Sequence, residues 1–525
     1  MTTSLPCIDV IAAAVSECDI KTIACVPGYP TTGIAERLIA EAHAEWCINE
    51  KLAMEIALGT SACGSRSMVI VKHVGMNVLA DPLITACTHT IGAGIVIIAG
   101  DDPLAIGSQN EQDSRYWGLV AEVPVLDPNP RNLRFAISEA YLLSEAVRTP
   151  VIVRVTDRLM QSECTHTIEG EQTQSKSGSY LFDRSIWEYS MHGRYQLFHR
   201  DTYPIMERLS EDSHLNVCTE DGADADADAD TSTGVQTQTP AQTPTQAGAR
   251  AQACIISSGY ASTTVDMILR QKRLNIPHLS LSFVNPLPIG TIADFIRDRR
   301  VLIVEETGTV VESQLQSGCV LGRRSGHLPH GGLTKDDILF AMENLDKDVL
   351  ELDVYPETLE SRGFTREICD DCPFIPIYEA IKNVKKEKGL LIAGDVGCSI
   401  RTAPTGVVDL AYALGSAIGV ASGMPEKSIA VIGDFGLMHS GLQALFDAKS
   451  NNRDVLAIVL QNRVSAMTGG QDVPDMTRVI RACCNDVTVI DESADRRFIE
   501  RLIHGKLTAR GVSVIVANGR CRKYL

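Results

Sequence analysis

Short runs of β-branched residues alternate with longer helical patterns along most of this chain, and this alternation limits what it can fold into. Strands separated by helices form βαβ units, whose strands run parallel and whose helices cover the sheet. We therefore expect an α/β protein built on mostly parallel sheets. The expected strands are 22–26, 67–71, 95–99 and 151–155, then 253–257, 279–282 and 301–305, and finally 390–392, 429–432, 455–460 and 512–516.

One stretch of the chain has the composition of a linker. Residues 220–250 read EDGADADADADTSTGVQTQTPAQTPTQAGAR, with a single Val as the only sizeable apolar side chain. Such a segment buries too little surface to offset its chain entropy. It divides the 525 residues into five expected parts. These are an α/β domain at 1–160, a polar and irregular connector at 161–219, the disordered linker at 220–250, a smaller α/β domain at 251–360 and a third α/β domain at 361–525.

Composition narrows the partners and the compartment. The net charge of −18 disfavours nucleic acid and anionic lipid. No apolar run reaches the roughly 18 residues of a membrane span, and no basic segment precedes the apolar N-terminus, so we expect a cytoplasmic protein without a signal peptide. Sixteen cysteines in such a chain indicate buried thiols or metal ligands rather than disulfides. Seven read as ordinary core thiols: Cys7, Cys18, Cys25, Cys47, Cys63, Cys87 and Cys254.

Two strand ends in the last domain carry oxygen ligands. Gly433 and Asp434 end the run SIAVIGD, and Asn462 follows VLAIVLQN, with a helix expected at 439–449 between them. The side chains should meet at the carboxyl edge of neighbouring parallel strands, where ligands bind. Carboxylate and amide oxygens suit Mg²⁺, which keeps room for phosphate oxygens. Taken alone, the Gly-Asp pair and the Asn are more typical of ordinary turn residues of an α/β protein, and the surrounding residues decide for the metal site.

The wider motifs resemble one enzyme family. The stretch GDFGLMHSG…LQNRVSAMTGGQ is similar to thiamine diphosphate-dependent 2-oxo acid:ferredoxin oxidoreductases, especially the large subunits of indolepyruvate ferredoxin oxidoreductases. Further stretches of the same resemblance are PGYPTT at 27–32, WCINEKLA at 46–53, KHVGMN at 72–77, DPL at 81–83, SQNEQDSR at 108–115, NPLP at 285–288 and VEE at 304–306. The resemblance covers nearly the whole chain except the linker.

The resemblance implies an architecture and a set of cofactor contacts. Residues 1–160 would bind the aminopyrimidine and residues 361–525 the diphosphate, with a transketolase C-terminal-like domain at 251–360 between them. The diphosphate would be held through Mg²⁺ by Asp434, Asn462 and the carbonyl of Val464. Gly28, Gly397 and Gly433 would lie against the cofactor.

The same resemblance implies catalytic side chains. Glu50 aligns with the carboxylate that activates the aminopyrimidine. It also fits a helix N-terminus stabilised by the dipole, and both roles are compatible. His73 and Arg115 would face the substrate carboxylate, although a structural salt bridge is the preferred interpretation of Arg115.

Four cysteines match the family's ligands of a proximal [4Fe-4S] cluster. They are Cys369 and Cys372 in a CxxC, Cys398 in GDVGC and Cys521 near the end of the printed chain. Zinc or four unligated thiols are the alternatives, and Cys483-Cys484 is a weaker source of the fourth ligand. The family usually has CxGCPH here, whereas this chain has two aspartates inside the CxxC and Phe374 in place of the His. Such aspartates should lower the cluster's potential.

The predicted reaction is the oxidative decarboxylation of an aryl or other 2-oxo acid. Coenzyme A would accept the acyl group, and the electrons would pass through the cluster to ferredoxin. The family's two ferredoxin-type CxxCxxCxxxC motifs are not in the printed sequence, so we expect a separate carrier, in an anaerobic host. A smaller beta-type subunit would complete the enzyme, which we expect to be a dimer of the large subunit or a hetero-oligomer. The alternatives are a non-oxidative decarboxylase or carboligase similar to sulfopyruvate or phosphonopyruvate decarboxylases, and a thiamine-binding paralogue with a regulatory or scaffolding role.

Overall fold

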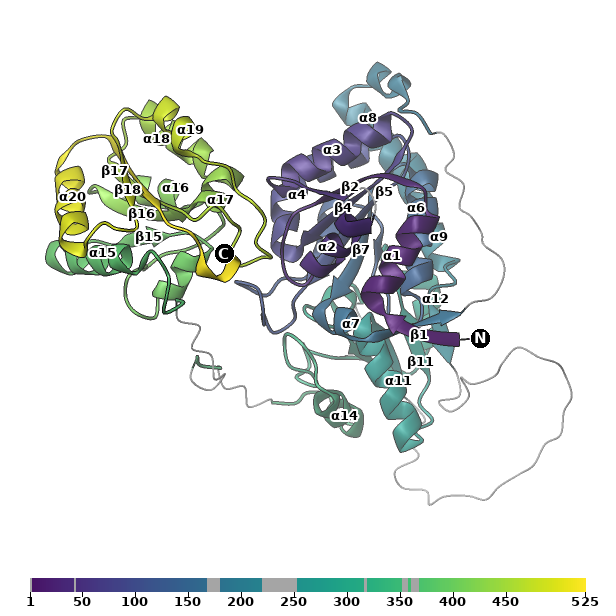
Figure 1. Ribbon diagram of the computed structural model, residues 1–525. Helices are drawn as coiled ribbons and strands as arrows, with labels where there is room; N and C mark the ends of the chain where they lie inside the picture. The colour runs from purple at the N-terminus through teal and green to yellow at the C-terminus, as the bar shows by residue number, and fades with distance from the viewer. Residues whose placement is uncertain are drawn as a thin grey trace, which may run out of the picture. The chain divides into compact units, whose positions relative to one another are not determined.

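The structure, a computed structural model, describes residues 2–41, 44–167, 180–219, 253–315, 319–351, 357–359 and 368–525. The chain divides into two compact units, Met1–Val354 and Tyr355–Leu525 (Figure 1). The expected linker at 220–250 lies outside the described residues. None of the described helices combines the length and apolarity needed to cross a bilayer.

A seven-stranded sheet forms the larger part of the first unit. Its strand order is β12-β6-β7-β5-β4-β2-β3, and every neighbouring pair is parallel except β12 with β6. The strands are β2 (Ile20–Cys25), β3 (Ala44–Trp46), β4 (Arg66–Lys72), β5 (Ile95–Asp101), β6 (Val125–Leu126), β7 (Val151–Thr156) and β12 (Phe283–Asn285). The predicted α/β class with parallel sheets is confirmed.

Helices cover both faces of this sheet, as right-handed crossovers between parallel strands require. Helices α3 and α4 lie on one side, and α1 and α6 lie on the other (Figure 1). The helices of this layer are α1 (Cys7–Glu17), α2 (Thr32–Glu41), α3 (Glu50–Ala62), α4 (His73–His89), α5 (Tyr116–Ala121), α6 (Leu133–Val147) and α7 (Asp157–Gln161). The central strands β4, β5 and β7 are almost completely buried between them, which is typical of parallel sheets.

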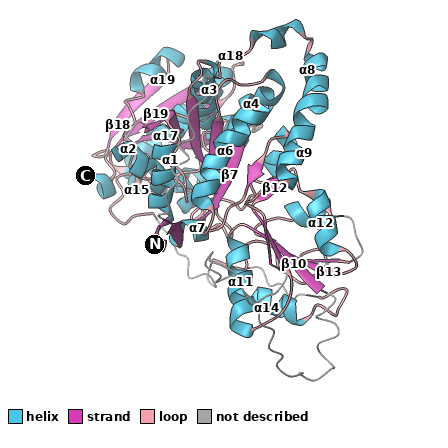
Figure 2. Ribbon diagram, turned by 90° about the vertical axis from the view of Figure 1, so that its right-hand side faces the viewer, coloured by secondary structure: helices cyan, strands magenta, loops and turns pink. Residues whose placement is uncertain are grey.

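A second, five-stranded sheet completes the first unit. Its order is β14-β13-β10-β11-β9, with only β9 antiparallel to its neighbour. Its strands are β9 (Val217–Thr219), β10 (Ala253–Ser258), β11 (His278–Leu281), β13 (Arg300–Val304) and β14 (Val320–Leu321), and its helices are α11 (Tyr260–Lys272), α12 (Ile289–Ile296), α13 (Val310–Gln314) and α14 (Lys335–Glu343). Figure 2 shows this sheet beside α11 and α14. A continuous apolar core joins the two sheets, with Cys254, Ile256 and Ile303 packed into it.

The expectation of an irregular segment before the linker was wrong for most of its described part. Residues 184–211 form a run of helical elements: η1 (Arg184–Glu188), α8 (Met191–Leu197), η2 (Phe198–Thr202) and α9 (Tyr203–Glu211). Helix α9 packs on α6 and α12, with Met206 fully buried. Because α9 is moderately polar, its amphipathic pattern was not recognised in the sequence. Its apolar face finds a partner only in the folded unit.

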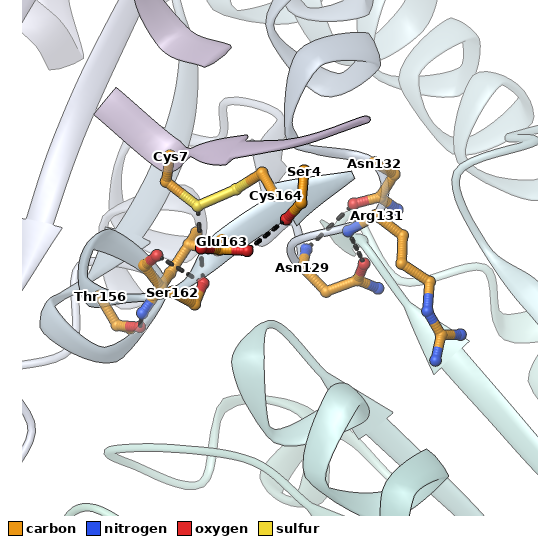
Figure 3. The surroundings of a disulfide bond; sticks show 10 residues. Ser4, Cys7, Asn129, Arg131, Asn132, Thr156, Ser162, Glu163 and Cys164 are labelled. Atoms are coloured by element: carbon orange, nitrogen blue, oxygen red, sulfur yellow. Dashed lines mark hydrogen bonds between the residues drawn. A yellow bond between two sulfur atoms is a disulfide. The ribbon is translucent and has the colours of Figure 1, made fainter. Parts of the chain in front are cut away.

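The expectation that Cys7 is an ordinary core thiol was also wrong. Strand β1 (Thr2–Pro6) pairs antiparallel with β8 (Glu163–Thr167), and Cys7, directly after β1, forms a disulfide with Cys164. Figure 3 shows this bond beside the hydrogen bond from Ser4 to Glu163. The two cysteines are 157 residues apart in the chain, so only the strand pairing brings them together.

The second unit is one parallel sheet of five strands in the order β15-β16-β17-β19-β18. The strands are β15 (Ile392–Gly394), β16 (Ser428–Gly433), β17 (Val455–Gln461), β18 (Val487–Asp491) and β19 (Val512–Asn518). Strand β15 begins two residues after the predicted strand. Alternate residues enter two separate cores, so that Ile429 and Val431 face one side and Ala430 and Ile432 the other.

Two layers of helices cover this sheet. Helices α15 and α20 pack together on one face, and α16 and α18 pack on the other (Figure 1). The helices are α15 (Ile375–Lys388), η3 (Cys398–Thr402), α16 (Ala417–Ser422), α17 (Asp434–Gly436), η4 (Leu437–Gly441), α18 (Leu442–Ser450), α19 (Thr477–Cys483), α20 (Arg496–Thr508) and η5 (Arg522–Tyr524). The helix expected at 439–449 is thus present as η4 and α18.

Candidate functional site

Glu50 is the first residue of helix α3, directly beyond the carboxyl end of β3. The side chain of Asn49 caps the helix by accepting a hydrogen bond from Leu52 N–H over 2.9 Å. Glu50 is only 5% exposed although it carries a carboxylate. A carboxylate at this position is stabilised by the helix dipole, and its burial keeps it away from bulk water. Both features fit a carboxyl that acts on a bound ring, as predicted from the resemblance.

The third residue of α4 packs directly against this carboxyl. A Cβ placed on Gly75 would lie 2.6 Å from Oε1 of Glu50 and 2.7 Å from its Cγ. Such distances are shorter than any real Cβ contact, so only glycine leaves room for Glu50. The glycine therefore determines where the Glu50 carboxyl can lie.

Lys72, at the end of β4, is a further charged group at this edge of the sheet. Its Nζ donates a hydrogen bond to Oε1 of Gln109 over 2.6 Å. Burial lowers the pKa of Lys72, while the charges of Glu50 and Asp102 oppose the shift. Gly28 lies over the lysine stem, since a Cβ there would come within 2.7 Å of Lys72 Cδ and Cγ. Gly28 is thus at the same strand edge as Glu50, as expected of two residues near one cofactor.

His73 is buried at the start of α4, and both of its ring nitrogens are occupied. Nδ1 lies 3.2 Å from the carbonyl oxygen of Gly100, and Nε2 lies 3.1 Å from that of Asn110. These contacts hold the ring between strand β5 and the following loop. A catalytic role for His73 stays a prediction, because in this conformation its polar atoms are used by backbone groups.

Arg115 lies in a fully buried ion cluster. Its guanidinium pairs with Asp113 at 2.6 Å and with Glu305 at 3.0 Å, which connects the two sheets of the first unit. The structure thus agrees with the interpretation of Arg115 as a structural salt bridge. Buried charges of this kind are retained only when they are paired and hydrogen-bonded.

Asp434 and Asn462 lie at the ends of neighbouring parallel strands, as predicted. In the β16–β17 register Gly433 is opposite Leu460. The two carboxylate oxygens of Asp434 accept hydrogen bonds from the backbone N–H groups of Arg463, at 2.6 Å, and Phe435, at 2.9 Å. The turn that carries Val464 therefore binds directly to Asp434.

The chemistry of this turn fits a divalent cation. Burial raises the pKa of Asp434 to about 7, against the lowering effect of the backbone donors. A cation bound beside this carboxyl would favour its charged form and so oppose the effect of burial. The Asn462 side-chain oxygen accepts from Val464 N–H over 2.9 Å, which fixes the turn. A Cβ placed on Gly433 or on Gly397 would meet no described atom within 4 Å, so both glycines border open space.

The four predicted cluster cysteines share one neighbourhood. Burial raises the pKa of the Cys398 thiol to about 11, and Arg401 lowers it. The other three thiols, Cys372, Cys521 and Cys369, each raise it further, in that order. Electrostatic effects of this kind indicate that the other three thiols lie in the surroundings of Cys398.

Backbone contacts explain this convergence. The CxxC folds as a turn in which Cys372 N–H donates to the carbonyl of Cys369 over 3.0 Å. Gly519, two residues before Cys521, packs on this segment, because a Cβ there would lie 2.9 Å from Cβ of Pro373. The end of β19 is thereby held against the CxxC.

The fit of this neighbourhood to an iron–sulfur group is supported by its donors. The Phe374 N–H hydrogen-bonds to the Cys372 sulfur, and the Arg401 guanidinium acts on Cys398. Both stabilise anionic sulfur. Within the described part of the chain, however, no three His, Cys, Asp or Glu side chains are gathered tightly enough to hold a metal as they stand. The cluster stays a prediction.

Cys483 and Cys484 lie elsewhere in the second unit. They are buried in the core on the α16–α18 face of the sheet, beside residues such as Ile480 and Val512. The largest cause of the raised pKa of each thiol is burial, and none of the four predicted cluster cysteines acts on either of them. Nothing in this position favours them over Cys521 as the fourth ligand.

The sequence interpretation gave no individual role to several residues near these sites. They include Lys72 and Gly75 around Glu50, and Tyr378 and Arg401, which interact electrostatically with the cysteines. Lys72 and Gly75 stood inside a quoted motif, so their position after a predicted strand was an available signal. Tyr378 lies in an unremarkable helical pattern, and only the packing of α15 reveals it.

A family model supplies the class of the protein. The C-terminal TPP-binding domain of thiamine pyrophosphate enzymes matches residues 397–490, which include Asp434, Asn462 and Val464. The second unit therefore contains a thiamine pyrophosphate-binding enzyme domain.

Curated relatives make the identification more specific. The indolepyruvate oxidoreductase subunit IorA of Methanothermobacter marburgensis is 28% identical over 501 residues, which cover 88% of this chain and 75% of that protein. The subunit of the same name from Archaeoglobus fulgidus is 28% identical over 98% of this chain and 85% of its own length. The resemblance to indolepyruvate oxidoreductases that the sequence indicated is confirmed by these relatives.

A solved structure is a more distant match. The 2-oxoglutarate:ferredoxin oxidoreductase from Magnetococcus marinus matches with a TM-score of 0.47 and 13% identity, over 66% of this chain and 65% of that one. At this TM-score the likeness carries no weight for function.

Proposed function

We propose that this chain is the thiamine-binding subunit of an enzyme that oxidatively decarboxylates an aryl 2-oxo acid such as indolepyruvate, forms the acyl-CoA, and passes the electrons through a [4Fe-4S] cluster to a ferredoxin. The observation that supports this proposal is the match of residues 397–490 to a thiamine pyrophosphate-binding domain, in a unit where Cys369, Cys372 and Cys521 all act on the pKa of the Cys398 thiol. Thiamine diphosphate supplies the carbanion chemistry that decarboxylation needs.

Each group of residues has a role in this proposal. Glu50 holds a proton at the aminopyrimidine ring from a buried helix N-terminus. Asp434, Asn462 and the carbonyl of Val464 would hold Mg²⁺, which would neutralise charge on the diphosphate when both are bound. Gly28 belongs to the sheet edge that carries Glu50, whereas Gly397 and Gly433 let phosphate oxygens approach the backbone closely.

Domain boundaries and partners belong to the same proposal. The seven-stranded sheet would be the pyrimidine-binding domain, the five-stranded sheet the transketolase C-terminal-like domain and the second unit the diphosphate-binding domain. The curated relatives are named as subunits, which supports a second, smaller subunit here. A cytoplasmic, anaerobic setting would suit the oxygen sensitivity of an exposed cluster.

The test starts from the electron path. The purified chain would be reconstituted anaerobically with iron and sulfide, reduced with dithionite and examined by low-temperature EPR. We expect a [4Fe-4S]⁺ signal that is lost in Cys398→Ala and kept in Cys63→Ala, an exposed thiol of the first unit. With the smaller subunit added, indolepyruvate and coenzyme A should together drive viologen reduction.

A different outcome would favour the other function. If thiamine diphosphate binds but no iron does, and aldehyde forms without coenzyme A, the chain is a non-oxidative decarboxylase.

The Mg²⁺ site is tested separately by calorimetry. We expect Asp434→Asn to bind thiamine diphosphate more weakly, whereas Asp447→Asn, an exposed position on α18, serves as the control. We expect at least about a tenfold loss of affinity in the first variant, because outer-shell changes alone cost that much.

A further inference from the structure

Lys72 is a cation at the candidate site that forms an ion pair with no carboxylate of the described residues. It is the last residue of β4 and is only partly exposed. Its Nζ donates one hydrogen bond, of 2.6 Å, to the side-chain oxygen of Gln109, which is uncharged. An ammonium group has three donors. Because a lysine that is withdrawn from water is usually paired, the remaining donors and the charge suit an anionic ligand.

The carboxylates that act on Lys72 make their contacts elsewhere. The charges of Glu50 and Asp102 favour the charged lysine, whereas burial lowers its pKa. Asp102 accepts hydrogen bonds from two backbone N–H groups of the loop that follows it, at 3.0 and 2.7 Å. The Glu50 carboxyl packs against Gly75. A bound anion would therefore be the direct partner that the ammonium group does not have within the described chain.

Contacts at both ends hold the Lys72 side chain in place. A Cβ on Gly28 would come within 2.7 Å of Lys72 Cγ and Cδ, so the Gly28 backbone packs on the lysine stem. At the other end, the loop that carries Gln109 is attached to α4, because His73 Nε2 lies 3.1 Å from the Asn110 carbonyl oxygen. A cation that is held in this way can orient a substrate as well as attract it.

Helix α4 brings this lysine close to Glu50. Lys72 is the N-cap residue of α4, and Gly75, which contacts the Glu50 carboxyl, is the third residue of the helix. Three residues rise by about 4.5 Å along a helix axis. The backbone of Lys72 therefore lies within one helical turn of the glycine that limits Glu50.

The two residues that were expected to face the substrate carboxylate have other partners. Both ring nitrogens of His73 lie beside backbone carbonyl oxygens. The Arg115 guanidinium is buried and paired with Asp113 and Glu305. Of these three candidates, Lys72 is thus the one whose charge is not already neutralised by a described side chain.

We propose that the Lys72 ammonium group binds the carboxylate of the 2-oxo acid and so selects anionic substrates. This inference rests on the proposed function. During decarboxylation the C–C bond to the carboxylate breaks, its electron pair stays with the acyl carbon, and the carboxylate leaves as uncharged CO₂. The ion pair is therefore strongest before the bond breaks. Lys72 contributes to substrate binding rather than to the rate of bond breaking.

The test compares Lys72→Met with Lys51→Met, a matched loss of one ammonium group at an exposed lysine next to Glu50 that pairs with Glu55. With thiamine diphosphate, Mg²⁺ and the smaller subunit present, release of labelled carbon dioxide from carboxyl-labelled indolepyruvate gives kcat and KM. We expect KM to rise roughly 10- to 100-fold in Lys72→Met, because a hydrogen bond to a charged group is lost, with kcat unchanged or higher. Lys51→Met should keep both constants, and exchange of the thiazolium C2 proton should persist in both variants.

A measurement on the wild type keeps the proposal testable if Lys72→Met does not fold. Indolepropionate has the carboxylate but lacks the 2-oxo group, and indolepropionamide lacks the charge as well. We expect calorimetry to show at least about tenfold tighter binding of the acid than of the amide. Equal binding of the two compounds, or binding of neither, would overturn the role of Lys72.

The outcomes separate this inference from the proposed function. If the wild type releases no carbon dioxide from aryl or aliphatic 2-oxo acids, both proposals fail. If it releases carbon dioxide but reduces no viologen, the oxidative function fails, and KM still decides the role of the lysine. If KM is unchanged in Lys72→Met, or if kcat and the C2 proton exchange fall instead, only the role of Lys72 fails, because the lysine would then act on Glu50 or on the fold.

Discussion

Replacing Gly75 by alanine should lower the rate of catalysis although no catalytic atom is removed. The new Cβ would lie 2.6 Å from Oε1 of Glu50, 2.7 Å from its Cγ and 3.0 Å from its Cδ. Ordinary contact begins at 3.4 Å, so the carboxyl must retreat by about 0.8 Å, the difference between 3.4 and 2.6. A displacement of about 1 Å at a reacting group can cost about 100-fold in rate. We therefore expect kcat/KM to fall by roughly 10- to 100-fold, or about 1.4–2.7 kcal/mol of transition-state stabilisation.

The magnitude depends on whether Glu50 or the backbone moves. Alanine is favoured over glycine inside a helix by about 0.5–1 kcal/mol, so α4 itself should not unfold. The matched control is Gly59→Ala in the neighbouring helix α3, where a Cβ would meet no described atom within 4 Å. This control should keep full activity and a slightly higher melting temperature.

The assay has two readouts. Steady-state viologen reduction with saturating thiamine diphosphate gives kcat/KM, and exchange of the thiazolium C2 proton for deuterium, followed by NMR, reports on the step that Glu50 serves. Calorimetry should show thiamine binding within about threefold of the wild type, because the perturbation is to orientation rather than to the diphosphate site. In a Glu50→Gln background the same Gly75→Ala change should cost little further activity, since residues in contact are not additive.

Either of two results would refute the role of Gly75 in placing Glu50. If Gly75→Ala exchanges the C2 proton at the wild-type rate, then either Glu50 does not act on the ring or its carboxyl has room that the structure does not show. Equal additional losses in the wild-type and Glu50→Gln backgrounds would also contradict it, because the glycine would then act through another residue.

Three further predictions concern stability and redox state. Glu145 accepts two hydrogen bonds of 2.7 Å from the buried Arg66 guanidinium, and Glu145→Gln removes the negative charge of that pair. We expect the free energy of unfolding of the first unit in urea to fall by about 3–5 kcal/mol. A loss below about 1 kcal/mol would argue against a buried charge at this position. Burial raises the pKa of Asp157 to about 6, so the folded chain binds the proton more tightly than the unfolded chain does. The stability of the folded chain should therefore fall as the pH rises from about 4 to about 6. In Asp157→Asn the melting temperature should change less across that pH window, and at pH 7 it should be higher than that of the wild type. If the variant shows the same dependence of melting temperature on pH as the wild type, the raised pKa of Asp157 is contradicted. The Cys7–Cys164 disulfide leaves 14 thiols of 16, which the denatured, unreduced chain should show with Ellman's reagent, whereas 16 would mean that the bond is not formed.

Much of the candidate site was predictable because its residues stand at the ends of regular elements. Asp434 and Asn462 each follow a run of buried β-branched residues, and parallel strands with one intervening helix must place such ends side by side. Glu50 was similarly marked by its position at a helix start within a quoted motif. These inferences use information that lies within a few tens of residues along the chain.

The shortest strands and the helices before the linker were harder to predict from the sequence. Strands β6, β12 and β14 have only two or three residues, too few for a period-two pattern to show. Helix α9 has a polar outer face, and its buried face is defined by α6 and α12. Propensity alone is weak where tertiary packing decides the state of a segment.

By itself, the sequence determined the class of fold, the longer strands of each unit, and the residues that could bind a diphosphate through Mg²⁺. Tertiary structure alone decided that Gly75 limits the position of Glu50 and that Cys7 reaches Cys164 across 157 residues. The physical reason is the range of the interactions. Helical and strand periodicities repeat every few residues and can be read along the chain, whereas a buried contact joins two side chains whose meeting depends on how every intervening element packs.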